Sequence, residues 1–267
     1  MRILIKNEKK PESIGEMVRF WRQAKRVSQL DLALDIDISS KHLSFVETGR
    51  ARPSRNLVLK IAQRLKMPLR QQNAFLLAAG YAPEFDQAPF DGQKMQMVRE
   101  ALHRIMEKHA PYPAFVVDTA YTILMKNSGY DHLVTIYAGE NALKKHENAM
   151  RILFSEDGLR PYVVDWPAVE QFLLNRLWEE AAVTQHEGLM ELCEEMSRLR
   201  TVTEIAAFQH AGNPPVMRLV LEKDTKRASF FTTIATLGTP LDVTTQELRI
   251  ELLFPADEET KQLFPPA

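Results

Sequence analysis

Apolar and polar positions alternate with helical spacing through the first eighty residues of the chain. Ile14, Met17 and Val18 recur at three- and four-residue intervals, and Trp21 continues the stripe. This spacing predicts an amphipathic helix that starts after Ser13. Similar stripes follow, each short and each bounded by polar residues, so the pattern predicts five short helices in this part of the chain.

Serines and glycines mark the ends of these helices. Ser28, Ser39 and Ser54 stand before apolar stripes and can accept the first backbone N–H groups as N-caps. Gly49 and Gly80 follow stripes and supply the left-handed residue that ends a helix. The second and third helices are separated only by a turn of three or four residues. This arrangement is typical of a helix-turn-helix domain.

Beyond residue 93 the chain carries both helical and strand-like patterns. A helix beginning near Met95 precedes two β-rich runs, Ala114–Val117 and Tyr121–Met125, which a short turn joins as a hairpin. The later segments are four helical patterns and then three strand-like ones: Asn148–Phe154, Pro167–Ala182, Leu189–Leu199, Thr203–His210, Val216–Glu222, Ala228–Leu237 and Gln246–Phe254.

The order of these elements predicts an all-α helix-turn-helix domain followed by an α+β domain with an antiparallel sheet of about five strands. In the last strand, Glu247, Arg249 and Glu251 alternate with apolar residues, which indicates one buried and one exposed face. A PAS-like sensor domain has such a layer, and other α+β folds share the order. Prolines punctuate the stretch after residue 80. The predicted boundaries are 1–80 for the first domain, 81–93 for a linker and 94–267 for the second domain.

Charge divides the chain at the same place. Residues 1–80 hold 16 Lys and Arg against seven Asp and Glu, a net charge of +9, whereas the other 187 residues hold 18 against 28, a net charge of −10. A basic segment joined to an acidic one suggests that only the first meets a polyanion. A solvated basic face would give the same count, so charge alone leaves both interpretations open.

Composition narrows the function classes. No apolar run reaches the ~18 residues of a membrane-spanning helix, and the opening run is too short for a secretory signal. Cys193 is the single cysteine, which excludes a disulfide framework and a thiolate metal cluster within one chain. We therefore expect a protein of the reducing cytoplasm, with no metal and no cofactor.

The segment SQLDLALDIDISSKHLSFVETGRARPS resembles the DNA-binding core of the Xre family of phage-repressor-like regulators. The resemblance implies that Gln29, which opens the second helix, binds a phosphate, and that Arg22 pairs with Glu47 across the small core. One position departs from the family: Asp37 stands in the turn that usually carries glycine. Asp tolerates the left-handed conformation better than most residues, so we expect modest strain and an unchanged fold.

If the third helix enters the major groove, its outward residues contact operator DNA. Lys41 can donate to guanine, and Phe45 can touch a thymine methyl group or, alternatively, another protein surface. Arg50 and Arg52 follow the helix where they could clamp the phosphate backbone. The candidate DNA-binding residues are Gln29, Ser39, Ser40, Lys41, Ser44, Phe45, Arg50 and Arg52. Leu30 and Leu34, one turn apart, mark an intramolecular or dimer contact, or are simply exposed leucines.

The segments YPAFVVD, ILFSEDGLRPYVVDW and FFTTIATLGTPLDVTTQELRIELLFPADEET resemble the MmyB-like ligand-binding domain that follows a helix-turn-helix in many bacterial regulators. The resemblance implies a transcription regulator with a PAS-like pocket for a small, apolar, fatty-acid-like effector. No local motif identifies the pocket. The candidates, although such strand residues are more often simple core, are Phe115, Val117, Leu124, Phe172, Phe230, Ile234 and Leu252.

A search for catalytic motifs finds none. There is no glycine-rich phosphate loop, no HExxH and no serine in a nucleophile elbow. Paired acidic residues such as Glu179-Glu180 are expected on solvated helical faces. The leading hypothesis is therefore a homodimeric DNA-binding regulator that senses a small molecule. The alternatives are a DNA-tethered protein-interaction module without a small-molecule effector, and an enzyme whose site only the fold assembles.

Overall fold

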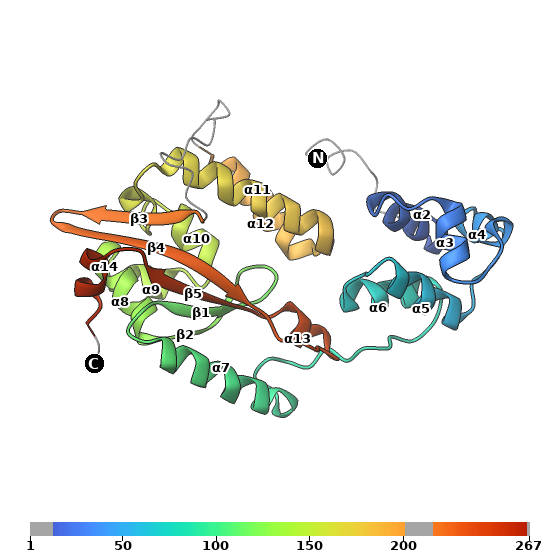
Figure 1. The fold of residues 1–267 in the computed structure, drawn as a ribbon, viewed down its shortest axis with the longest axis horizontal. Helices are drawn as coiled ribbons and strands as arrows, with labels where there is room; N and C mark the ends of the chain where they lie inside the picture. The colour runs from blue at the N-terminus through green and yellow to red at the C-terminus, as the bar shows by residue number, and fades with distance from the viewer. Residues whose placement is uncertain (1–12, 201–215, 266–267) are drawn as a thin grey trace. The chain divides into compact units, whose positions relative to one another are not determined.

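The structure, a computed structural model, describes residues 13–200 and 216–265 (Figure 1). They fall into two compact units. The N-terminal unit consists of the described residues up to Gln87 together with Leu241–Gln246, and the C-terminal unit holds the rest. The change of unit between Gln87 and Ala88 lies inside the predicted linker 81–93.

The N-terminal unit contains the five predicted helices. In chain order they are α2 (Ile14–Ala24), α3 (Gln29–Asp35), α4 (Ser40–Glu47), α5 (Arg55–Arg64) and α6 (Leu69–Ala78).

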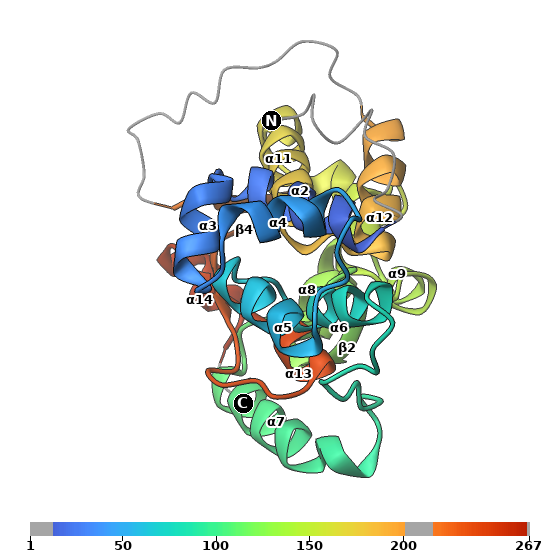
Figure 2. The same ribbon diagram turned by 90° about the vertical axis from the view of Figure 1, so that its right-hand side faces the viewer.

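The predicted caps are present at three of these helices, whose ribbons Figure 2 shows. The hydroxyl oxygens of Ser28, Ser39 and Ser54 each accept a backbone N–H of the first turn that follows. Ser13 adds a fourth cap, in which its side chain and that of Glu16 bond reciprocally to backbone N–H groups. These local bonds satisfy amides that a helix leaves unpaired, which is why such short helices begin where they do.

The core of this unit is closed and apolar, and two backbone features shape it. Val18, Leu43 and Phe75 are completely buried. Asp37 takes the left-handed conformation with φ of 60°, as the turn between α3 and α4 requires. Gly15 lets α2 approach the end of α4 closely, because a Cβ at this position would lie 2.6 Å from the carbonyl oxygen of Val46.

Helix α6 begins without a side-chain cap of its own, since Pro68 precedes it. The cap comes from a residue far along the chain: the Leu69 amide donates to Gln246 Oε1 over 2.7 Å. Gln246 belongs to a short helix, α13 (Val243–Glu247), whose Val243 amide donates to the Asp86 carbonyl oxygen. Residues 241–246 are thereby part of the N-terminal unit.

The C-terminal unit is built on an antiparallel sheet with the order β2-β1-β5-β4-β3. This confirms the predicted five-stranded α+β layer, within the residues that the structure describes. The strands are β1 (Ala114–Val117), β2 (Ile123–Lys126), β3 (Arg218–Lys223), β4 (Lys226–Ala235) and β5 (Arg249–Pro255). The last strand starts later than predicted because residues 243–247 form α13.

Helices cover both faces of this sheet (Figure 1). One face carries Ala114, Val116 and Ile250 and packs under a single long helix, α7 (Gln96–His109), which the short turn η1 (Gln93–Met95) precedes. The other face carries the larger core. Its covering elements are α8 (Ser128–Tyr137), α9 (Glu140–Lys145), α10 (Ala149–Phe154), η2 (Arg160–Tyr162), α11 (Trp166–Thr184), α12 (Glu187–Arg198) and α14 (Glu258–Leu263).

The predicted helices that correspond to α10, α11 and α12 are confirmed, whereas α8, α9, α13 and α14 were not predicted. Of these, α9, α13 and α14 span only five or six residues each, whereas the ten-residue α8 was missed. The predicted helix Thr203–His210 lies outside the described residues.

Candidate nucleic-acid interface and ligand cavity

A buried carboxylate joins three elements of the helix-turn-helix. The Arg22 guanidinium from α2 binds the Glu47 carboxylate at the end of α4 through two bonds, Nε to Oε1 at 2.6 Å and Nη2 to Oε2 at 3.0 Å. Gln29, the first residue of α3, donates from Nε2 to Oε2 over 2.7 Å. The predicted pair of Arg22 with Glu47 is therefore confirmed.

The environment of Glu47 favours its charged form. Burial by itself raises the pKa of this carboxyl, but the hydrogen bonds from Arg22 and Gln29 outweigh burial and lower the pKa below its usual value. The side chain of Glu47 is completely buried. A charged, bidentate bond of this kind has a strict geometry, so it fixes the angle at which α4 packs against α2.

Gln29 is thus engaged in the core as well as being a candidate phosphate ligand. Its amide nitrogen carries two hydrogens, and the bond to Glu47 uses one of them. The same bond holds the side chain in place at the N-terminus of α3, where backbone N–H groups favour an anion. The resemblance did not reveal this positioning contact.

The outward face of α4 brings together three of the predicted DNA contacts. Lys41 is exposed, and its Nζ lies 5.7 Å from the centre of the half-buried Phe45 ring. The Arg50 guanidinium carbon lies 6.0 Å from the same ring. Ser40 is exposed and Ser44 half-buried. Two cations around one aromatic ring form a positive surface beside an apolar one, as contact with phosphate and base edges requires.

Two predicted contacts have structural bonds of their own. Ser39 is the N-cap of α4, and its hydroxyl oxygen accepts the His42 amide. Arg52 donates from Nε and Nη2 to the Ala79 carbonyl oxygen at the end of α6. Its guanidinium also lies 5.6 Å from the Tyr81 ring centre. Arg52 therefore ties the loop after α4 to α6, a role that the sequence did not indicate.

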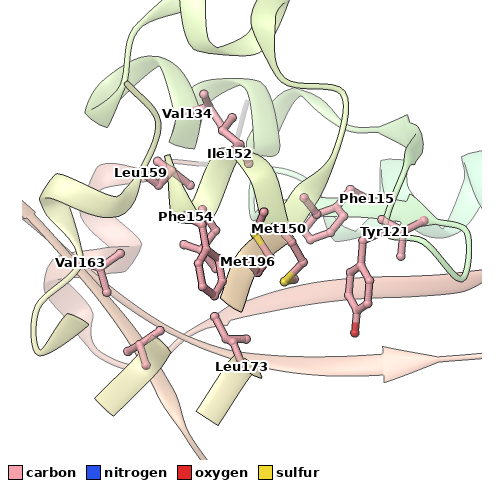
Figure 3. Close-up of a cluster of buried hydrophobic side chains, with 14 of the residues drawn as sticks. Phe115, Tyr121, Val134, Met150, Ile152, Phe154, Leu159, Val163, Leu173 and Met196 are labelled. Carbon is pink, nitrogen blue, oxygen red and sulfur yellow. The ribbon is translucent and has the colours of Figure 1, made fainter. Parts of the chain in front are cut away.

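The C-terminal unit contains a cavity of about 480 Å³ between the larger face of the sheet and the helices α8, α10 and α11. Its wall is mostly apolar, and Figure 3 shows Phe115, Met150 and Leu173 among the side chains of this region. The volume lies in the range of small-molecule sites, ≈ 300–1,000 Å³. The layers therefore leave a pocket between them that is open to solvent, since its lining residues Phe172, Val216 and Ile234 are exposed.

Three of the predicted pocket residues line this cavity and four do not. Phe115, Phe172 and Ile234 form part of its wall. Leu124 and Leu252 lie in the core under α7. Because strand side chains alternate between faces, Glu251 and Leu253 reach the cavity while Leu252 turns away from it.

Val117 and Phe230 face the helices of the larger core but do not reach the cavity. Val117 is completely buried at the end of β1. Phe230 packs against Phe264, with ring centres 5.4 Å apart. Phe264, the residue after the unpredicted helix α14, covers Phe230, and neither Phe230 nor Val117 is among the residues that line the cavity.

One wall of the cavity is charged, which the sequence analysis missed. Arg176 on α11 and Glu251 on β5 both reach the cavity, and Arg176 Nη2 lies 3.1 Å from Glu251 Oε1. Arg176 Nε also donates to Glu180 Oε1 over 3.2 Å. Behind this pair, Tyr121 donates its hydroxyl to Glu180 Oε2 over 2.8 Å, and Arg249 donates to the same oxygen.

Two sequence-based interpretations are thereby corrected. Glu180 lies half-buried in an ion network and not on a solvated helical face. Arg249 and Glu251 do not form an exposed strand face, because α11 covers them. Glu251 is almost fully buried, and burial raises the pKa of its carboxyl despite the opposing effect of Arg176. The alternation of charged and apolar residues in β5 gave no sign that a helix lies over the polar face.

The part of the chain that the structure describes contains no cluster of three or more His, Cys, Asp or Glu side chains that could hold a metal ion. Cys193 is buried, and burial raises the pKa of its thiol to about 12, which keeps it protonated. Among the described helices none is long and apolar enough to cross a membrane.

Comparison with known families assigns both units. Residues 18–72 match the family model described as "Helix-turn-helix", and residues 98–264 match the one described as "MmyB-like transcription regulator ligand binding domain". Among curated proteins, none matches the chain. The two matched segments contain the α4 surface and the cavity, respectively.

Proposed function

The chain belongs to the family of the MmyB-like transcription regulator ligand binding domain, which a helix-turn-helix precedes here. On this premise we propose that the protein is a homodimeric, cytoplasmic regulator. It binds operator DNA and senses a small apolar, fatty-acid-like effector. The observation that carries the effector proposal is the cavity of about 480 Å³. Each methylene group buried there contributes about 0.8 kcal/mol, so an acyl chain would bind with few polar contacts.

The DNA-binding part of the proposal rests on α4. Lys41 and Arg50 flank the Phe45 ring, and the buried bond between Arg22 and Glu47 holds this helix to α2. The net charge of +9 over residues 1–80 supplies the long-range attraction to a polyanion. We propose Ser40, Lys41, Ser44 and Phe45 as base contacts, and Gln29, Ser39, Arg50 and Arg52 as phosphate contacts.

The dimer proposal rests on α3. Within the N-terminal unit, the side chains of Leu30 and Leu34 are 59% and 69% exposed, which is unfavourable for two leucines one turn apart. A second copy that covers them would also place two helix-turn-helix domains on one operator, as symmetric half-sites require.

The effector proposal is tested by filling the cavity. Ile234 lines it from β4, so Ile234→Trp should abolish stabilisation of the full chain by an acyl probe such as decanoate. DNA binding by the full-length variant serves as the reference and should be unchanged, because no cavity residue lies in the N-terminal unit. Thr233→Trp is the matched control, because Thr233 is the exposed neighbour of Ile234 on β4 and does not line the cavity.

Two outcomes contradict the effector proposal. If Ile234→Trp lowers the melting temperature of the ligand-free chain by the equivalent of ~1–3 kcal/mol, the site is overpacked core and not a pocket. If no apolar small molecule stabilises the wild-type chain but a protein from the cell does, the alternative holds: a DNA-tethered protein-interaction module.

A further inference from the structure

The connection between the last two strands of the sheet is longer than their pairing requires. Ala235, the last residue of β4, lies opposite Ile250 in β5, so a tight hairpin could join the two strands. Hairpin loops usually have ~2–5 residues, but here residues 236–248 form the connection. Its middle part, Leu241–Gln246, belongs to the N-terminal unit. Turning the chain at the end of the sheet does not explain a connection of this length.

The segment Leu241–Gln246 is fastened within the N-terminal unit at two points. The Val243 amide donates to the Asp86 carbonyl oxygen, and the Val243 side chain is buried. Gln246 Oε1 accepts the Leu69 amide over 2.7 Å. The first amides of a helix have no partner within the helix, and α6 has no side-chain cap from the residue before it. Gln246 thus satisfies a group that α6 itself leaves unpaired.

The other connection between the units is held on the same helix. The chain passes into the C-terminal unit after Gln87 and after Gln246, and it returns before Leu241. Just ahead of Gln87, Asn73 on α6 accepts the Phe85 amide and donates to the Phe85 carbonyl oxygen. Both connections therefore reach the N-terminal unit at segments that are bonded to α6.

Helix α6 is also joined to the candidate DNA-binding surface. At its C-terminal end, the Ala79 carbonyl oxygen accepts two bonds from the Arg52 guanidinium. Arg52 lies in the loop after α4, together with Arg50, which flanks the Phe45 ring. A change at the start of α6 can thus reach two of the proposed phosphate contacts through one helix.

Strand β5 links the segment to the cavity over a short stretch of chain. Glu251 lines the cavity, and the residues between it and Gln246 include Leu248 and Arg249. Leu248 is buried in the core under α7, and Arg249 donates to Glu180 on α11. These contacts hold the stretch in place, so a displacement of β5 at the cavity is passed on to α13.

The β4 side of the connection differs from the β5 side. Between the cavity residue Ile234 and the segment, the chain runs through Gly238 and Thr239, which are both exposed. An exposed stretch that contains glycine bends easily and transmits little. We therefore assign the transmission to β5, and a substitution at Ile234 leaves DNA binding unaffected.

We propose that α13 couples the cavity to the DNA-binding unit, and that the bond between Leu69 and Gln246 is the contact that a bound effector changes. The inference rests on the proposed effector function and adds the route by which binding reaches DNA. The two states are the bond made and the bond broken, and both the cavity and the DNA surface bias their ratio. Gln246 is a positioning residue, since it does not line the cavity and acts on DNA through α6.

The test measures the DNA affinity of the full-length protein with and without saturating decanoate. The DNA probe is a duplex that the protein itself selects from a random pool. In the wild-type chain we expect decanoate to change the DNA dissociation constant at least ~5-fold, and DNA to change the decanoate dissociation constant by the same factor. In Gln246→Ala both changes should fall below ~2-fold while decanoate still binds.

Two control variants separate coupling from simple structural support. Gln246→Glu keeps an acceptor oxygen at the start of α6, where negative charge is favourable, so it should retain the coupling. Gln63→Ala removes an exposed glutamine from α5 in the same unit and should also retain it. If Gln246→Ala lowers DNA affinity equally with and without decanoate, its role is merely structural and the inference is overturned.

Hydrogen exchange on the wild-type chain gives a readout that needs no variant. Decanoate should change the protection of peptides that contain Leu69 and leave those of α2 unchanged. If Gln246→Ala does not fold, this measurement decides, and unchanged protection at Leu69 overturns the inference.

The outcomes distinguish the inference from the function on which it rests. If decanoate and DNA both bind the wild-type chain without affecting each other, the coupling is overturned and both binding functions stand. If decanoate does not bind at all, the effector function and the coupling fail together.

Discussion

Each unit of this protein contains a network of arginine and glutamate, and the two networks do opposite things. In the N-terminal unit, Glu47 is completely buried and its bonds to Arg22 and Gln29 lower its pKa. In the C-terminal unit, Glu251 is nearly as buried, but it borders a cavity and its pKa is raised. The residue types and bond lengths are similar, so the difference lies in how completely each carboxylate is satisfied.

The comparison teaches how the same chemistry serves rigidity in one place and recognition in another. Glu47 accepts two bonds from Arg22 and a third from Gln29, and its side chain is completely buried. Its network holds helices together. Glu251 has a single bond of the same kind to Arg176, and its other side adjoins the cavity. A carboxylate left partly unsatisfied at a cavity wall retains the capacity to bind a ligand.

The largest effect is expected when the Glu47 network is broken, and it falls on the stability of the N-terminal unit. Arg22→Ala leaves the buried Glu47 charge without its bidentate partner, and removing one member of a buried pair costs about 3–5 kcal/mol. Arg64→Ala is the control, because its ion pair with Asp35 is exposed and contributes ~1 kcal/mol or less. Denaturant unfolding of the full-length protein measures both. Equal losses for the two variants would show that Arg22 acts as a surface residue.

A second effect concerns the DNA surface that the Glu47 network positions. Lys41→Ala should cost about 1–3 kcal/mol at one base position of the operator and change sequence preference. Arg50→Ala should weaken all sequences alike and lower the salt slope by about one phosphate contact. Binding titrations over a set of operator variants at several salt concentrations distinguish the two. A uniform loss in Lys41→Ala would mean that α4 is oriented differently on DNA.

The third effect is the pH dependence of stability, which is smaller and has the opposite sign in the two units. The pKa of Glu47 is lowered in the folded state, so its contribution to stability is present above the unfolded value of 4.5 and is lost as the pH falls through the folded value. The pKa of Glu251 is raised, so its contribution is present below 4.5 and is lost as the pH rises through the folded value.

Replacing each glutamate by glutamine sharpens this contrast. Glu47→Gln should be strongly destabilising near neutral pH, whereas Glu251→Gln should change the stability of the ligand-free chain by only ~1 kcal/mol. The unfolding free energy of Glu251→Gln should also vary less between pH 5 and pH 8 than that of the wild-type chain. Thermal unfolding of both variants across this pH range makes the measurement. Similar losses of unfolding free energy in the two variants at neutral pH would show that the two glutamates contribute alike and that bordering the cavity makes no difference to Glu251.

The sequence was most informative where structure follows from neighbours along the chain. The caps at Ser28, Ser39 and Ser54, the turn at Asp37 and the strand positions in the sheet all depend on local hydrogen bonds and side-chain periodicity. The pairing of Arg22 with Glu47 was also predictable, because the resemblance to a known DNA-binding core supplied the long-range partner.

Predictions were weakest where two distant segments meet. Alternation in β5 shows which residues share a face, and it assigned Arg249 and Glu251 correctly to one face, but it cannot show that α11 covers that face. The same limit explains Leu124 and Leu252, which are apolar strand residues like Phe115 but lie under α7. Which face of a sheet borders a cavity depends on the volume of every side chain between the layers.

The sequence by itself thus determined the two kinds of domain, the helix-turn-helix frame and the candidate DNA contacts on α4. Only the tertiary structure decided that Gln29 and Arg52 are held by core contacts, that Gln246 caps α6 from far along the chain, and that a charged pair closes one wall of the cavity. The physical reason is the range of the interactions. Caps and periodicity act within one or two turns, whereas cavities and buried ion networks arise from packing between segments that the sequence leaves far apart.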